Sequence, residues 1–130
     1  MARLGSSIAE YLKQDAALTA LVGNRVFYIR TPDGTPYPVV VIRDIVRNRE
    51  YTHDGITSMA EWFQIDVYAE NPDSCTAAAD RIISRLGGFT GHIGDYRIGY
   101  AFIVNTIDEH SQEYPVYRTI VEVRVGYSER

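Results

Sequence analysis

Two segments of the sequence alternate apolar and polar residues so regularly that each must be a β-strand with one buried face. They run from Met59 to Ala69 and from Val116 to Tyr127. Successive side chains of a strand point to opposite faces of a sheet, so each segment has one apolar and one mixed face. The predicted core residues are Phe63, Ile65, Val67, Val121, Val123 and Val125, and those of the opposite face are Trp62, Gln64, Asp66, Tyr68, Arg118, Ile120, Glu122 and Arg124.

Helical periodicity and further strand signals surround these two segments. A helix is predicted over Ser74–Leu86, and a helical segment, either one bent helix or two, precedes Gly23-Asn24. Its N-terminus is expected at Ser6 or Ser7, with Glu10 completing a capping box. Further expected features are a second N-cap at Asp15, a cap at Asn71, a buried helix stripe of Ala78, Ile82, Ile83 and Leu86, and strands over Arg25–Arg30, from Val39 onward and over Tyr96–Ile107.

The predicted order of elements is α-β-β-β-α-β-β. Because the strands are joined by hairpins, the sheet is expected to be mostly antiparallel, with about five strands and two main helices on one face. This is the α+β class. The length of 130 residues fits a single domain over 1–130.

Composition excludes several classes of protein. Thirteen basic and seventeen acidic side chains give a net charge of −4. Proteins that bind nucleic acid through its phosphates usually carry a net positive charge instead. No apolar run is long enough to cross a membrane, and Cys75 is the only cysteine, so an internal disulfide is excluded. Ten tyrosines are unusual, and tyrosine is enriched where proteins meet.

Residues for catalysis or metal binding are sparse and scattered. His53, His92 and His110 fall in predicted turns without metal-ligand spacing, and no phosphate-binding glycine motif is present. Cys75 lies in the first turn of a predicted helix, where the helix dipole could activate a thiol, but a partly buried structural role is the simpler interpretation. The sequence therefore predicts no enzyme, no catalytic or metal site and no cofactor.

Asp44 and Asp66 interrupt apolar strands that are expected to pair. Across such a pair, two carboxylates could perform acid–base chemistry or bind a cation. The favoured interpretation is instead that they lie on the face without helices, opposite arginines of neighbouring strands. Salt bridges between subunits are a third interpretation.

The mixed sheet face combines aromatic and charged side chains, as protein interfaces do. The alternative is a tryptophan at a sheet edge, covered by a loop. The predicted subunit interface comprises Trp62, Asp66, Tyr68, Arg118, Ile120 and Arg124.

A polar hairpin tip is predicted over Arg47–Thr57, with a turn at Asp54-Gly55. A segment this polar buries little surface, so we expect it to be mobile until it meets a partner. Its candidate contact residues are Arg47, Arg49, Glu50, Tyr51, His53 and Asp54.

The residues resemble the tail-completion, or tail-terminator, proteins of long-tailed bacteriophages and prophages over nearly the whole chain. Arg47–Thr57 matches no motif of that family, so its role as a tail contact is inferred from the hairpin alone. The similar segments are Leu21–Phe27, Pro36–Val41, Phe63–Ala69, the helix with Ala78, Ile82 and Leu86, and the two closing strands.

This resemblance implies a structural virion protein of the tail neck that is assembled in the host cytoplasm. Its subunits would form a ring, commonly a hexamer, that caps the tail tube, stops its polymerisation and meets the head-side connector. DNA would pass through without specific binding, and no membrane would be involved. The alternatives are another neck component, such as a head-closure or adaptor protein, and an unrelated α+β enzyme or ligand-binding domain.

Overall fold

A computed structural model describes residues 3–51, 57–111 and 116–129 of the chain. Over these ranges it contains three helices and six strands. The helices are α1 (Leu4–Leu12), α2 (Ala16–Val22) and α3 (Pro72–Leu86). The strands are β1 (Val26–Tyr28), β2 (Val39–Tyr51), β3 (Thr57–Ala69), β4 (Gly91–Ile93), β5 (Tyr96–Ser111) and β6 (Val116–Glu129).

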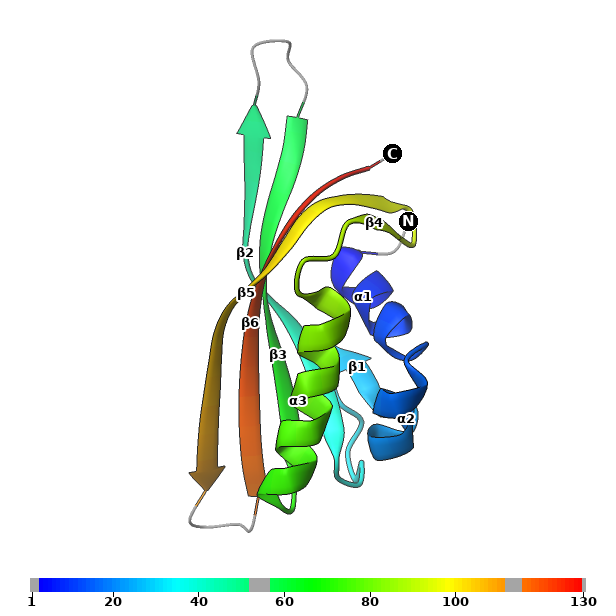
Figure 1. Cartoon of the computed structure of the whole chain (residues 1–130), viewed down its shortest axis with the longest axis vertical. Helices are drawn as coiled ribbons and strands as arrows, with labels where there is room; N and C mark the ends of the chain where they lie inside the picture. The colour runs from blue at the N-terminus through cyan, green and yellow to red at the C-terminus, as the bar shows by residue number, and fades with distance from the viewer. Residues whose placement is uncertain (1–2, 52–56, 112–115, 130) are drawn as a thin grey trace.

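The six strands form one sheet in the order β1-β2-β3-β6-β5-β4. Every neighbouring pair is antiparallel except β1 and β2, which are parallel. The three helices cover one face of this strongly twisted sheet and leave the other face open (Figure 1). The α+β class is therefore confirmed, and the predicted five strands and two helices are close to the six and three observed.

The core lies between α3 and the apolar faces of β3 and β6, as the alternation predicted. Phe63, Ile65 and Val67 are completely buried, and Val121, Val123 and Val125 are at most 1% exposed. They share one cluster with Ala78, Ile82 and Leu86 of α3. The face of each of these strands is confirmed.

Two of the predicted helix caps are present and one is wrong. The Asp15 side chain accepts a hydrogen bond from the Leu18 N–H, and that of Asn71 accepts one from Ser74. The first helix, however, begins at Leu4 rather than after Ser6 or Ser7, and its N-cap Arg3 makes no side-chain cap. Leu4 is almost fully buried, and packing it against the core explains the earlier start.

Local pairing also revises the ends of the sheet. Gly91–Ile93 form the short strand β4, which the sequence pattern does not predict and which pairs with Tyr96–Ile98 at the start of β5. The first strand is shorter than expected and runs parallel to β2, which alternation alone does not determine. The β2–β3 hairpin and the β5–β6 hairpin extend to opposite ends of the long axis (Figure 1).

Candidate assembly surface

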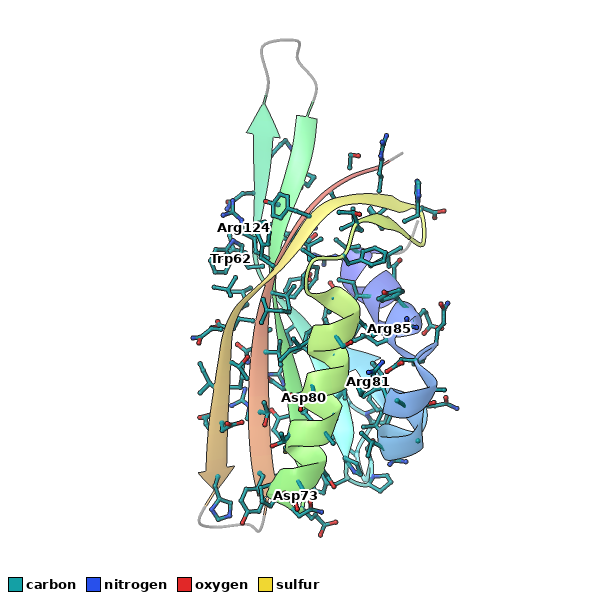
Figure 2. All side chains as sticks on the ribbon, in the orientation of Figure 1. Trp62, Asp73, Asp80, Arg81, Arg85 and Arg124 are labelled. Carbon is teal, nitrogen blue, oxygen red and sulfur yellow. The ribbon has the colours of Figure 1, made fainter. Side chains whose placement is uncertain are left out.

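The sheet face without helices carries the mixed residues that the alternation predicted. Cross-strand pairing aligns Trp62 with Arg124, and Tyr68 with Arg118. β3 lies between β2 and β6, so Trp62 is on an interior strand and not at a sheet edge. Figure 2 shows Trp62 and Arg124 on the side of the sheet opposite α3.

Asp66 is completely buried on this face and is paired within its own chain. Its Oδ2 accepts hydrogen bonds from Arg118 at 2.9 Å and from Arg43 at 3.3 Å. The Gln64 amide and the Tyr68 hydroxyl add further donors at 3.0 and 3.4 Å. The favoured interpretation of Asp66 is thus confirmed, and its carboxylate holds together β2, β3 and β6.

We predict that Asp66→Asn lowers the free energy of unfolding by about 2 kcal/mol. The amide has half the acceptors of a carboxylate and removes the charge that pairs with Arg118, and hydrogen bonds to charged groups contribute more than neutral ones. Chemical denaturation of the purified chain measures the change. Glu109→Gln is the matched control, because Glu109 also contacts Arg118 but its side chain is 50% exposed. Glu109→Gln should lower the free energy of unfolding by under about 1 kcal/mol. An equal loss of stability in the two variants would contradict this role of Asp66.

Aromatic rings surround the guanidinium of Arg124. Its Cζ lies 5.8 Å from the ring centroids of both Trp62 and Tyr100. Tyr100 in turn stacks on Phe102, with ring centroids 5.0 Å apart. Tyr100 also lies so close to Gly126 that a Cβ there would be 1.9 Å from the ring. This row of side chains crosses β3, β6 and β5 and forms the aromatic part of the open face.

Large apolar side chains remain exposed at the sides of the open face. Val46 of β2 is 44% exposed, while Phe102 and Ile107 of β5 are 58% and 39% exposed. Ile120 between them is 9% exposed, so it contributes more to the fold than to a free surface. Phe102 and Ile107 were absent from the predicted interface. The alternation of β5 is interrupted between Ile103 and Asn105, which hides the pattern from a sequence reading.

Asp44 does not share a face with Asp66, so the favoured placement of Asp44 on the face without helices is wrong, and the alternative of a carboxylate pair across the strands is wrong as well. Asp66 lies opposite Val41 on the open face, whereas Asp44 lies opposite Phe63 on the helix side. There Asp44 accepts hydrogen bonds from the Tyr28 hydroxyl and, at 2.8 Å, from Arg3. The register of the β2–β3 pairing shifts between Asp44 and Val46, directly after this position.

Glu61 is the buried acid that sequence reasoning missed. It is 3% exposed and accepts a hydrogen bond of 2.5 Å from the Tyr127 hydroxyl. Burial raises the pKa of Glu61 to about 7, and the Asp44 carboxylate adds to the rise, while the Tyr127 hydroxyl opposes it. Counting in steps of two from Phe63 places Glu61 on the core side, which is the signal that could have revealed it.

The hairpin predicted as a polar tip is a regular ladder for much of its length. Arg47 pairs with Glu61, and the pairing continues to Tyr51 and Thr57. Arg47, Arg49, Glu50 and Tyr51 are thus strand residues, since backbone hydrogen bonds hold a segment that buries little apolar surface. His53 and Asp54 lie outside the described residues.

Cys75, His92 and His110 are the described members of the group considered for catalysis, and His53 lies outside the described residues. The Cys75 thiol donates to the Tyr117 carbonyl oxygen at 3.2 Å, and burial raises its pKa, which disfavours a reactive thiolate. His92 lies opposite Arg97 near the start of β5, whereas His110, near the other end of that strand, stacks on Tyr117. In the described ranges no three side chains of the metal-ligating types gather, and no helix is long and apolar enough to cross a membrane.

Comparison with known proteins assigns the chain to a family. The family model for tail completion protein gp17 matches residues 6–128. This chain belongs to that family. The predicted resemblance to tail-completion proteins is therefore confirmed, and the chain is a bacteriophage-type structural protein of the virion tail.

A solved structure shares the fold of this tail completion protein. It is a chain of the virion of a native gene transfer agent particle, with a TM-score of 0.76 and 19% sequence identity. The match covers 95% of this chain and 93% of that one, so the two folds agree over nearly their full length. No curated protein matches the sequence.

Proposed function

We propose that this chain is a ring-forming tail terminator, and that six or so copies cap the tail tube, stop its polymerisation and join the tail to the head-side connector. Membership of the tail completion family, matched over residues 6–128, is the observation that carries this proposal. The subunit would be assembled in the host cytoplasm and remain in the neck of the virion. It would act without catalysis, metal or cofactor.

Charge supports a ring through which DNA passes without being held. The net charge of the chain is −4, and three arginines of the open face have partners there. Arg118 and Arg43 contact Asp66, and Arg124 lies against aromatic rings. Arginines that are already paired neutralise fewer DNA phosphates and displace fewer counterions from the DNA, so they bind DNA weakly.

The open sheet face and the β2–β3 hairpin are the proposed contact surfaces. In this proposal the predicted interface residues of the face (Trp62, Asp66, Tyr68, Arg118, Ile120 and Arg124) shape and stiffen the surface that neighbours meet. The hairpin reaches beyond the body of the sheet, so its outer part would contact the tail tube (Figure 1).

Native mass spectrometry and a tube-capping assay test the function. We expect the purified chain to form closed rings that bind tail-tube ends and halt their growth. Rings that bind the connector but leave tube growth unchanged would favour the alternative of a head-closure or adaptor protein. A monomer at all concentrations, with no effect on tubes, would refute the proposal.

A shortened hairpin separates ring formation from tube contact in this assay. Arg49 and Met59 are cross-strand partners, so replacing residues 50–58 by Asn-Gly closes the ladder with a two-residue turn and keeps its register. The proposed tail contact predicts that this variant still forms rings but no longer caps tubes. Unchanged capping would place the tube contact elsewhere.

A further inference from the structure

Two edges of the sheet are open along parts of their length, and both carry exposed apolar side chains. On β5, β4 covers only Tyr96–Ile98, and the Gly88 N–H bonds the Ala101 carbonyl oxygen. On β2, β1 pairs only with Val40–Ile42, and Ile29 adds a bond to Ile42. Within the described residues, no strand pairs with the outer sides of Phe102–His110 or of Arg43–Arg49.

An open edge presents unpaired backbone N–H and C=O groups and is a template for another strand. Long flat edges are usually protected by charges, prolines or a covering element. Here Phe102, Val104 and Ile107 are exposed along the β5 edge, and Ile45 and Val46 along the β2 edge. Edges with this apolar content are suited to pairing.

The two edges have opposite charge. Apart from Asp44, which bonds Arg3 and Tyr28, the open part of β2 bears Arg43, Arg47 and Arg49, and the open part of β5 bears Asp108 and Glu109. All five side chains belong to exposed residues. An edge joined to a copy of itself would place like charges together, whereas β5 joined to β2 places opposite charges together.

The complementarity also holds on each face of the sheet separately. Arg43, which pairs with Gln64, and Glu109, which pairs with Arg118, are on the open face. On the helix side, Arg47 pairs with Glu61 and Arg49 pairs with Met59, which packs against the core, and Asp108 pairs with Thr119. A sheet continued from β5 to β2 therefore brings an acid and an arginine together on both faces.

Strand direction and position allow this junction between two copies but not within one. β2, β3, β6 and β5 alternate in direction, so β2 and β5 run oppositely and can pair in the antiparallel manner. The open part of β2 leads toward one end of the molecule and that of β5 toward the other (Figure 1). A neighbour displaced along the long axis is needed to bring the two edges together.

We propose that the open β5 edge of one subunit pairs with the open β2 edge of a second copy of this chain. The two edges differ, so the contact is heterologous and repeats from subunit to subunit until the assembly closes. This inference rests on the proposed ring and names the strands that build it. Backbone hydrogen bonds would supply affinity, and the charges would select β2 as the partner of β5.

Charge reversal tests the junction. Arg49→Glu and Asp108→Arg, each alone, place like charges across every junction, and we expect each to shift the assembly to the mass of a single chain in native mass spectrometry. The double variant again has opposite charges across the junction, with the acid now on β2 and the arginine on β5, and it should recover the assembly. Asp80→Arg is the control for Asp108→Arg, with the same change of charge on the exposed side of α3, and should assemble normally.

Hydrogen exchange provides a second readout on the unmodified protein. Amides on the outer side of β5 between Asn105 and Asp108 should exchange at least tenfold more slowly in the assembly than in a diluted monomer. Intact rings in both single variants together with unprotected β5 amides would overturn the edge pairing but leave the ring proposal standing. A chain that never assembles would overturn both.

Discussion

Replacing Phe63 by alanine is expected to lower the free energy of unfolding by about 3–5 kcal/mol. Phe63 is completely buried in the cluster between the sheet and the helices. Its removal leaves a cavity that β3, held by strands on both sides, cannot collapse to fill. Denaturant unfolding, with the slope checked for two-state behaviour, measures the loss.

Trp62→Ala is the informative comparison for Phe63→Ala, because the two residues are neighbours on β3 with opposite faces. Trp62 is only partly buried and lies on the open face. Trp62→Ala should therefore lower the free energy of unfolding of the isolated chain by less than Phe63→Ala does. A loss below about 1 kcal/mol for Phe63→Ala would contradict the assignment of the core face.

The sequence was most informative where one face of a strand is fully buried. Burial of Ile65 and Val123 requires strict alternation, and a slip of one residue would expose the whole apolar set. That constraint determined the face of Asp66 as well, and hence its arginine partners. The order of β2, β3, α3, β5 and β6 follows because hairpins join β2 to β3 and β5 to β6, and because α3 separates β3 from β5.

The remaining parts depend on contacts distant in the sequence. β4 is three residues long and owes its existence to β5, and β1 is positioned by pairing with β2. Extra residues at Gly99 and Val104 shift the alternation of β5, so Phe102 and Ile107 could not be assigned to a face. Which edges stay open is a property of the complete sheet, and no local pattern reveals it.

The same distant contacts create the cluster around Glu61. Tyr127 comes from β6, Tyr28 from β1, and Arg3 precedes α1. The Asp44 Oδ1 atom is buried and has no donor among the described hydrogen bonds. Burial, followed by the hydrogen bond to Asp44, raises the pKa of Tyr28, and burial with the bond to Glu61 does the same for Tyr127. Because these two tyrosines keep their protons, Glu61 is the neighbour whose carboxyl group can be protonated and then donate a hydrogen bond to the Asp44 carboxylate.

We expect stability to fall by about 3 kcal/mol as the pH rises from 4.5 to above 7. Glu61 has a pKa of about 7 in the folded chain against an ordinary 4.5, so folding favours its protonated form. The stabilisation is complete below the unfolded pKa and is lost as the pH rises through the folded one. Each unit of difference corresponds to about 1.4 kcal/mol. Unfolding midpoints measured at half-unit intervals of pH provide the profile.

Glu61→Gln isolates the Glu61 contribution from the other acids. The amide oxygen can accept from the Tyr127 hydroxyl, and the amide NH₂ supplies a donor for Asp44 without a titrating proton. The variant should keep its stability across this range and exceed the unmodified chain by about 3 kcal/mol at pH 8. Asp80→Asn, at an exposed acid of α3, is the control and should retain the slope. A Glu61→Gln profile as steep as that of the unmodified chain would show that the Glu61 carboxyl is ionised throughout, with Arg3 and Arg47 compensating its charge.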